Sequence, residues 1–384
     1  MKKTDNNVVN LFEHTSKGTE SLVIADSLKM KRGGSLTRPS LAYETWGKLS
    51  KTKDNVIVIL TGLSANSHVA SSSANPKPGW WEGMVGPDKA INTNKYYVVC
   101  INSLGSCFGS TGPASINEIT GEPFRLTFPE LTIDDMAKAS RLLLDKLDIA
   151  NIHTLIGPSM GGMHALALVI QNYKFVKNLI AISTAFQSLP YAIAIRSIQR
   201  EVIRKDPLWK NGYYTHDNPP LNGVRIARKL GMISYRSANE WAHRFGRKKS
   251  SKDKITQNTF GIENTSFEFE IESYLEHLAI KFQDVFDANC YLYLSRSIDW
   301  FDVLDYGSSS KEVLGKTGLE SAMILGVESD ILFPINQQKE LAEYLSTNST
   351  KVVYKSLDCV QGHDSFLVDI ERFSKEITCY LKDT

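Results

Sequence analysis

The sequence lacks an excess of either charge. Among its 384 residues, 44 Lys and Arg stand against 42 Asp and Glu, which gives a formal net charge of +2. A chain so close to balance shows no basic excess of the kind that attracts nucleic acid or anionic membranes. We therefore expect neither a nucleic-acid partner nor a membrane partner, whereas small polar ligands remain open.

Long hydrophobic runs are also missing. No stretch approaches the roughly 18 apolar residues of a membrane span, and the polar segment 1–20 has no apolar centre of a signal peptide. The five cysteines form an odd set without a C-x-x-C pair or metal-ligand spacing beside histidine. We expect free thiols, no bound metal and a cytoplasmic location, and Cys107 in a Gly/Ser-rich loop is the thiol most worth testing for reactivity.

What the sequence does contain is enough apolar material for a large core, with 42% hydrophobic and 10% aromatic residues. Apolar runs alternate with helical patterns, which predicts a mostly parallel sheet with crossover helices. The expected strands lie at 36–46, 56–60, 96–102, 153–156, 179–183 and 321–326, and the expected helices at 131–147, 163–170 and near 337–345. This pattern indicates one large α/β domain with an insertion.

The alternation stops between Ala185 and Tyr306. That segment carries long helical patterns rich in Arg, Gln, Glu and aromatic residues, and its charged stretch 247–258 is expected to be a mobile loop. We predict a core formed by residues 1–184 and 307–384, with residues 185–306 inserted as a helical lid.

One short pattern is central to the chain: the G-x-S-x-G sequence of residues 157–161, with Ser159 in the middle. It lies between an expected strand and an Ala/Leu-rich helix, which is the arrangement of a nucleophile elbow. Glycines beside so tight a turn let the strand and helix pack closely. The pattern alone also fits an ordinary loop, so its context must decide.

A serine hydroxyl needs an adjacent base, and the base needs a carboxylate. In the nucleophile-elbow architecture the acid and the histidine follow the serine in chain order. Asp330 follows the expected strand 321–326, and His363 precedes a C-terminal helix. Ser159, Asp330 and His363 are therefore the predicted catalytic triad, with the amides of Leu63 and Met160 as the oxyanion hole.

Two other acids compete with Asp330. Asp364 is adjacent to His363 and is expected to point elsewhere, and Asp358 has no expected strand before it. The remaining histidines fit the chain order poorly and are expected to be structural or exposed, although His68 lies near the expected oxyanion loop; they are His14, His68, His153, His164, His216, His243 and His277.

Longer stretches of the chain carry a resemblance. They lie at 43–47, 79–87, 102–107, 109–115, 206–209, 274–275, 286–293 and 362–364, and together they resemble the homoserine O-acetyltransferase family of α/β-hydrolase-fold acyltransferases. The resemblance implies an α/β-hydrolase fold with an inserted helical lid, no cofactor, acyl-CoA and an amino acid as substrates, and a homodimer formed through the lid.

Segments 61–64, 81–84, 195–200 and 291–301 are most similar to the branch of this family that succinylates L-serine, a step toward cysteine. The resemblance implies succinyl-CoA as donor, read by Arg196. It also implies that Arg228 and Asp364 bind the amino acid. Four residues of the loop after the strand 56–60 are expected to determine substrate specificity: Gly62, Leu63, Ser64 and Ala65.

These implied roles are chemically reasonable. One arginine and one carboxylate pair with the two charges of an amino acid, and an arginine compensates the extra carboxylate of a succinyl group. Arg225 remains a competitor for Arg228. Arg196, Arg200 and Arg204 also recur at helical spacing, so a solvated basic face is an alternative, and the more favoured one for Arg204.

Two other activities stay open. Homoserine acyl transfer in methionine biosynthesis is the main alternative, because a pocket resolves one methylene by only roughly 10–200-fold. An esterase is less favoured, and a non-enzymatic protein would lack the complete triad in order.

Overall fold

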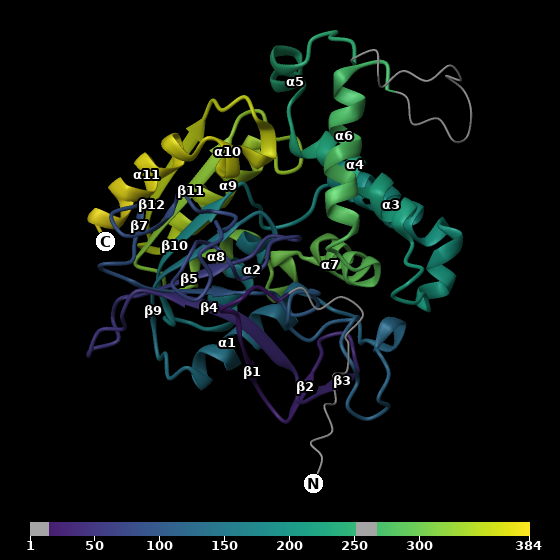
Figure 1. The fold of residues 1–384 in the computed structure, drawn as a ribbon. Coiled ribbons are helices and arrows are strands. Elements are labelled where there is room, and N and C mark those ends of the chain that lie inside the picture. Colours follow the sequence, from purple (N-terminus) through teal and green to yellow (C-terminus); the bar gives the residue numbers. More distant parts are fainter. Residues whose placement is uncertain (1–14, 251–266) are drawn as a thin grey trace.

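An eight-stranded sheet with the order β1-β4-β8-β5-β9-β10-β11-β12 runs through the centre of the molecule (Figure 1). The computed structural model describes residues 15–250 and 267–384, so positions 251–258 of the expected loop lie outside the described residues. The strands from β8 to β12 are parallel, whereas β4 is antiparallel to both β1 and β8. The predicted α/β-hydrolase fold with a mostly parallel sheet is confirmed.

The sheet strands are β1 (Glu20–Val23), β4 (Ser40–Trp46), β5 (Val56–Leu60), β8 (Tyr97–Ile101), β9 (Ile152–Pro158), β10 (Val176–Ile182), β11 (Ser321–Val327) and β12 (Lys351–Leu357). Two short pairs lie outside it: β2 (Ser27–Lys29) with β3 (Ser35–Thr37), and β6 (Val85–Gly86) with β7 (Ile91–Asn92).

Strand β5 shows why the sheet is covered on both faces. Its five residues are all apolar and fully buried, and alternate side chains join two different clusters: Val56, Val58 and Leu60 in one, Ile57 and Ile59 in the other. A strand with two buried faces has a continuous run of apolar residues in its sequence.

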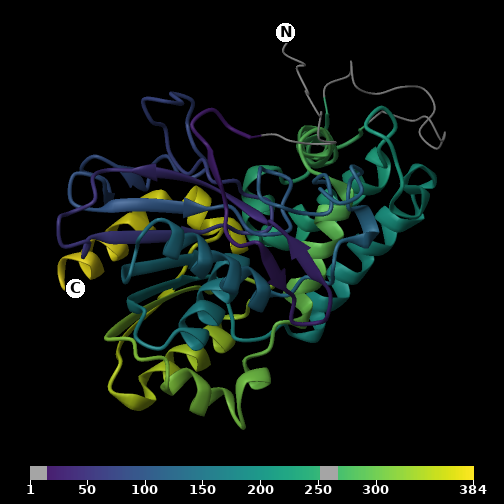
Figure 2. The same cartoon turned by 90° about the horizontal axis from the view of Figure 1, so that it is seen from below.

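Helices and loops cover the two faces (Figure 2). The first cluster contains side chains of α1 (Ile133–Lys146), α2 (Met160–Gln171), α8 (Ser310–Gly315) and α9 (Ile335–Leu345), whereas the second contains those of α11 (Ile370–Lys382). Short helical turns connect the longer elements: η1 (Arg125–Thr127), η4 (Val303–Tyr306), η5 (Ser346–Asn348), η6 (Gly362–Asp364) and α10 (Ser365–Val368).

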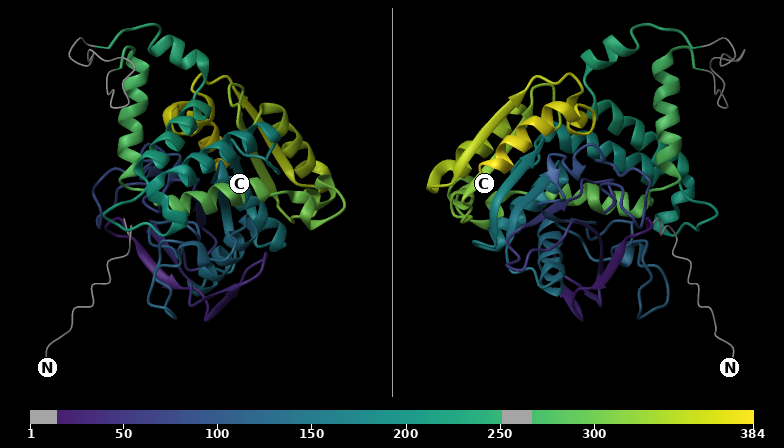
Figure 3. Two further views of the ribbon diagram at one scale, coloured as in Figure 1. Left: turned by 90° about the vertical axis from the view of Figure 1, so that its right-hand side faces the viewer. Right: turned by 60° about the vertical axis from the view of Figure 1, so that its left-hand side comes forward.

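The chain between β10 and β11 forms the helices that stand beside the sheet in Figure 3: α3 (Pro190–Lys205), η2 (Pro207–Gly212), α4 (Leu221–Tyr235), α5 (Ala238–Arg244), α6 (Glu270–Gln283) and α7 (Ala288–Trp300). Helix α4 packs between α3 and α6. The domain boundaries proposed at 184/185 and 306/307 stay a prediction.

Two expectations about strands were wrong. The expected strand 36–46 is broken, because Pro39 lacks a donor and Arg38 has a φ of 44°, so β3 and β4 are separate. Strand β12 was missed because it lies at a partly exposed sheet edge, where Lys and Ser interrupt a short apolar run. Asp358 therefore does follow a strand.

None of the described helices is long and apolar enough to cross a membrane.

Candidate active site

Ser159 occupies a strained turn between β9 and α2. Its φ of 54° and ψ of −125° are rare for a residue with a side chain, and its amide donates to the Ile182 carbonyl at 2.9 Å. A Cβ on Gly157 would lie 2.2 Å from the Gly161 carbonyl oxygen, and one on Gly161 would lie 2.2 Å from the Leu60 carbonyl oxygen. The G-x-S-x-G glycines are thus required by close packing around the serine.

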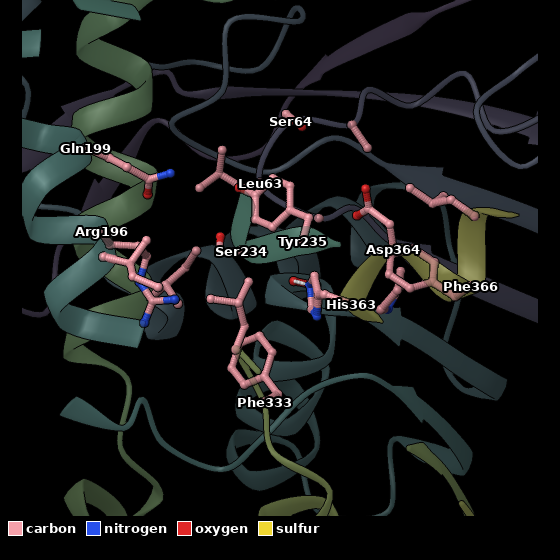
Figure 4. Close-up of a pocket in the computed structure, with 18 of the residues that line it drawn as sticks. Leu63, Ser64, Arg196, Gln199, Ser234, Tyr235, Phe333, His363, Asp364 and Phe366 are labelled. Atoms are coloured by element: carbon pink, nitrogen blue, oxygen red, sulfur yellow. Dashed lines mark hydrogen bonds between the residues drawn. The ribbon is translucent and has the colours of Figure 1, made fainter. Parts of the chain in front are cut away.

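The structure brings Ser159, Asp330 and His363 together from three separate strand ends. His363 Nε2 lies 2.8 Å from Ser159 Oγ, and His363 Nδ1 lies 2.8 Å from Asp330 Oδ2 (Figure 4 shows His363 in the pocket). An ionised carboxylate only accepts, so Nδ1 donates to Asp330 and Nε2 is free to accept from Ser159.

Asp330 is held by its own backbone turn. Its Oδ1 accepts from the amides of Leu332 and Phe333 at 2.9 and 3.0 Å, which leaves Oδ2 for His363. The competing Asp358 forms an ion pair with Arg372, and its side chain is 79% exposed. Asp330 rather than Asp358 therefore lies against His363, although the reason given against Asp358, the lack of a preceding strand, was wrong.

The surroundings of His363 raise its pKa. Burial lowers the pKa of His363, but the charge and hydrogen bond of Asp330 outweigh it, so the pKa is raised above its ordinary value of 6.5. Burial also raises the pKa of the neighbouring Asp364 carboxyl, against the opposing charges of His363 and Arg236. A site that stabilises the protonated histidine suits a base that takes a proton from serine.

The triad opens into a cavity of about 210 Å³ at the junction of core and lid. All four residues predicted to set specificity, Gly62, Leu63, Ser64 and Ala65, line it. The amide of Met160, the first residue of α2, has no carbonyl partner within its helix. Leu63 lines the cavity and Met160 directly follows Ser159, and the role of their amides as an oxyanion hole stays a prediction.

Arg196 reaches the same cavity from α3 (Figure 4). It is 6% exposed, and it donates through Nε to Asp299 at 2.6 Å and through Nη2 to Ser188 at 2.8 Å. Arg200 is also buried, whereas Arg204, one helical turn further along, is exposed. A basic face open to solvent is thus a correct description only of Arg204.

The two residues expected to bind an amino acid occupy different positions. Asp364 lines the cavity, whereas Arg228 does not, and the Arg228 guanidinium carbon lies 5.8 Å from the Tyr235 ring centroid. Arg225 is engaged with Glu276 on α6 at 3.1 Å, and Arg228 has no ion pair among the residues that the structure describes. The geometry therefore favours Arg228 over Arg225, without placing it in the cavity wall.

Sequence reasoning missed several residues near the cavity. Gln199, Ser234, Tyr235 and Trp80 line it, and Arg236 lies 3.5 Å from Asp364. They belong to helices and loops whose patterns predict an amphipathic surface, so only the packing of lid on core reveals them.

Two other candidates lie elsewhere. Cys107 is buried, with its sulfur 3.5 Å from the amide of Asp287, and it does not line the cavity. His68 bridges Glu44 and the Lys77 carbonyl at 2.8 Å each, which is a structural role. Within residues 15–250 and 267–384, no group of three or more His, Cys, Asp or Glu could hold a metal ion.

Known proteins share this architecture. A family model described as "alpha/beta hydrolase fold" matches residues 55–364. The serine O-succinyltransferase of Xanthomonas campestris pv. campestris (strain B100) is 47% identical and covers 97% of this chain and 100% of its own length. That of Frateuria aurantia is 51% identical over 92% of this chain and 95% of its own.

Among solved structures, the homoserine O-acetyltransferase from Bacillus anthracis is 26% identical, with a TM-score of 0.84. The match covers 96% of this chain and 98% of that one. The resemblance inferred from the sequence is confirmed.

Proposed function

Because the chain belongs to the serine O-succinyltransferase family of the α/β-hydrolase fold, we propose that it transfers a succinyl group from succinyl-CoA to the hydroxyl of L-serine. The observation that carries this proposal is the Ser159–His363–Asp330 geometry, which opens into a cavity that also holds a buried arginine. The product, O-succinyl-L-serine, would give cysteine on sulfhydrylation.

In the first half-reaction, His363 Nε2 takes the proton of Ser159 as its Oγ attacks the thioester carbon. The amides of Leu63 and Met160 stabilise the oxyanion that forms. The carbon–sulfur bond then breaks, His363 returns its proton to the departing CoA thiolate, and Ser159 is left as a succinyl ester. Asp330 stabilises the transient imidazolium throughout.

In the second half-reaction, the L-serine hydroxyl gives its proton to His363 and attacks the ester carbonyl. Collapse of the tetrahedral intermediate releases the new ester, and the proton returns to Ser159. Water is the competing nucleophile, so the lid must limit its access to the acyl-enzyme. No cofactor takes part in this proposal, with acyl-CoA as co-substrate only.

Arg228 and Asp364 are the proposed binders of the amino acid. Asp364 lines the cavity and suits the substrate ammonium. Arg228 has no acidic partner among the described residues, and its charge already acts on Asp364. A small movement of Tyr235, whose ring lies beside Arg228, would open that guanidinium to the substrate carboxylate.

The decisive experiment is a steady-state comparison of succinyl-CoA and acetyl-CoA, each with L-serine and L-homoserine. We expect the highest kcat/KM for succinyl-CoA with L-serine. The Bacillus anthracis match favours homoserine acetylation as the second candidate, and a preference for acetyl-CoA with L-homoserine would establish it instead.

A separate control distinguishes transfer from hydrolysis. CoA release is measured with and without the amino acid, because an esterase would consume acyl-CoA at a rate that no acceptor changes. Acceptor-independent turnover would contradict the transferase proposal.

Location and assembly complete the proposal. All five cysteines are free, which supports a reducing cytoplasm. Exposed isoleucines on the lid helices support a homodimer formed through the lid, and light scattering of the purified protein would test it; they are Ile198, Ile226, Ile233 and Ile280.

A further inference from the structure

Three charged side chains form a buried cluster between α3 and α7. Arg196 Nε lies 2.6 Å from Asp299 Oδ1, and Arg200 Nη2 lies 2.6 Å from Asp299 Oδ2. None of the three side chains is more than 8% exposed. One carboxylate is therefore shared by two guanidinium groups away from solvent.

The two arginines are held differently around that carboxylate. Arg196 uses Nε and Nη2 for Asp299 and Ser188, which leaves Nη1 without a partner among the described residues, and only Arg196 of the cluster lines the catalytic cavity. Arg200 donates through Nη1 to the Ser295 hydroxyl at 2.8 Å and faces a second hollow on the outer side.

The cluster carries two positive charges and one negative charge, a net charge of +1. The other charges in the outer hollow do not balance it: Arg204 and Arg296 have the same sign, and Glu130 is bound to Arg32 at 2.7 Å. Buried charges without counter-charge are costly, so the cluster as the described residues form it would be stabilised by one more anion. Of its three members, only Arg196 both lines the cavity and keeps an Nη1 group without a partner among the described residues.

We infer that Asp299 and Arg200 complete the binding site in which Arg196, already expected to read the acyl chain, holds its distal carboxylate. Arg196 contacts that carboxylate. Asp299 is a positioning residue that fixes the orientation of the Arg196 guanidinium, and Arg200 sets the net charge of the cluster. This inference rests on the proposed succinyl donor.

The role of Arg200 follows from charge balance. A lone Arg196–Asp299 pair would be neutral and would attract an incoming carboxylate weakly. Because Arg200 pairs with the second oxygen of Asp299, the cluster keeps one uncompensated positive charge. An incoming anion meets that charge at the side of Arg196 that faces the cavity. The carboxylate would complete a cluster of two cations and two anions.

The test compares kcat/KM for succinyl-CoA and acetyl-CoA on the same preparation, so the ratio does not depend on the folded fraction. Arg200→Gln leaves Arg196 in place and makes the cluster neutral. We expect the succinyl-to-acetyl ratio to fall by about 10-fold or more, in line with the loss of a charge-assisted interaction.

The double variant Arg200→Gln/Asp299→Asn removes one positive and one negative charge and so restores the net charge of +1, while the introduced amide oxygen can still accept from Arg196 Nε. We expect its ratio to return to within about threefold of the wild type. Arg204→Gln is the matched control, since it removes the same charge from the exposed part of the same helix, and it should leave the ratio unchanged.

Each result decides a different point. A wild type that does not use succinyl-CoA would overturn the proposed donor and this inference together. A wild type that uses it, combined with an unchanged ratio in Arg200→Gln, would overturn the inference alone. If Arg200→Gln does not fold, the double variant alone tests the inference. A succinyl-to-acetyl ratio of about one tenth of the wild-type value in the double variant would reject the idea that the net charge of the cluster sets donor preference.

Discussion

The core and the lid use charged and polar residues in different ways. In the core, Ser159, Asp330 and His363 lie at the ends of strands and are held largely by backbone amides and by one another. In the lid, the long side chains of Arg196 and Arg200 are held by other side chains of the same helical segment.

This difference suits the two regions to different roles. Strand ends are fixed by the sheet ladder, so the core can position a nucleophile, a base and an acid that serve any acyl transfer. A lid helix that presents Arg196 to the cavity can change the preferred acyl group without disturbing that geometry. We therefore propose that the core determines the reaction and that the lid determines which acyl group is transferred. Four predictions test this division.

The largest expected effect lies in the core. Ser159→Ala removes the nucleophile and should lower kcat for acyl transfer by about 10⁴–10⁶-fold with every donor and acceptor. The measurement is CoA release, together with mass spectrometry for an acyl-enzyme. Ser197→Ala, an exposed serine on α3, is the control and should keep full activity; substantial transfer by Ser159→Ala would reject the covalent route.

A second core variant should be almost as severe. Asp330→Asn keeps the shape of the side chain but favours the wrong tautomer of His363, and kcat should fall by about 10³–10⁴-fold. Thermal melting checks that the protein is folded. If donor preference changed while the rate with the better donor survived, the proposed separation of core and lid would be wrong.

A lid variant should act selectively. Arg196→Leu removes the only arginine that lines the cavity within the described residues, so kcat/KM for succinyl-CoA should fall by about 10–100-fold while acetyl-CoA is used as well as before. The two donors are assayed in parallel. Equal losses for both donors would show that Arg196 supports the site rather than reading the acyl chain.

The smallest expected effect is on the pH dependence of kcat/KM, to which a lid residue and core residues both contribute. His363 must be neutral to act as base, so kcat/KM for acyl-CoA should fall as pH drops through a pKa that is raised above 6.5, mainly because the charge and hydrogen bond of Asp330 outweigh burial. The charge of Arg196 lowers the pKa of His363 and that of Asp364 raises it.

These two neighbours give shifts of opposite sign. In Arg196→Leu the acid limb of the pH profile should move to higher pH, and in Asp364→Asn it should move to lower pH. If both pH profiles superimpose on that of the wild type, neither charge affects the pKa of His363.

Much of the core could be predicted because its signals are local. The apolar run 56–60 became β5 with the expected bounds, and the strand, serine turn and helix around residue 159 formed as the spacing indicated. Strand β12 was not predicted, because a partly exposed edge strand resembles a loop in composition. The order of acid and histidine still identified Asp330 and His363.

The lid was harder to read. Helical spacing placed Arg196, Arg200 and Arg204 on one stripe, but it could not distinguish buried from exposed positions, because burial depends on where α7 packs. Asp299 lies within the segment 291–301 that carries the resemblance, but no role was predicted for it, because its role depends on a contact that spans 103 residues to Arg196.

The sequence by itself determined the fold and the family, and it predicted Ser159, His363 and Asp330 as nucleophile, base and acid, because alternating apolar runs, glycines and chain order are properties of neighbouring residues. Only the tertiary structure decided that two arginines share one buried carboxylate, that Arg228 rather than Arg225 has no acidic partner among the described residues, and that the cavity lies between core and lid. Those features depend on distances between segments far apart in the chain, which no local pattern encodes.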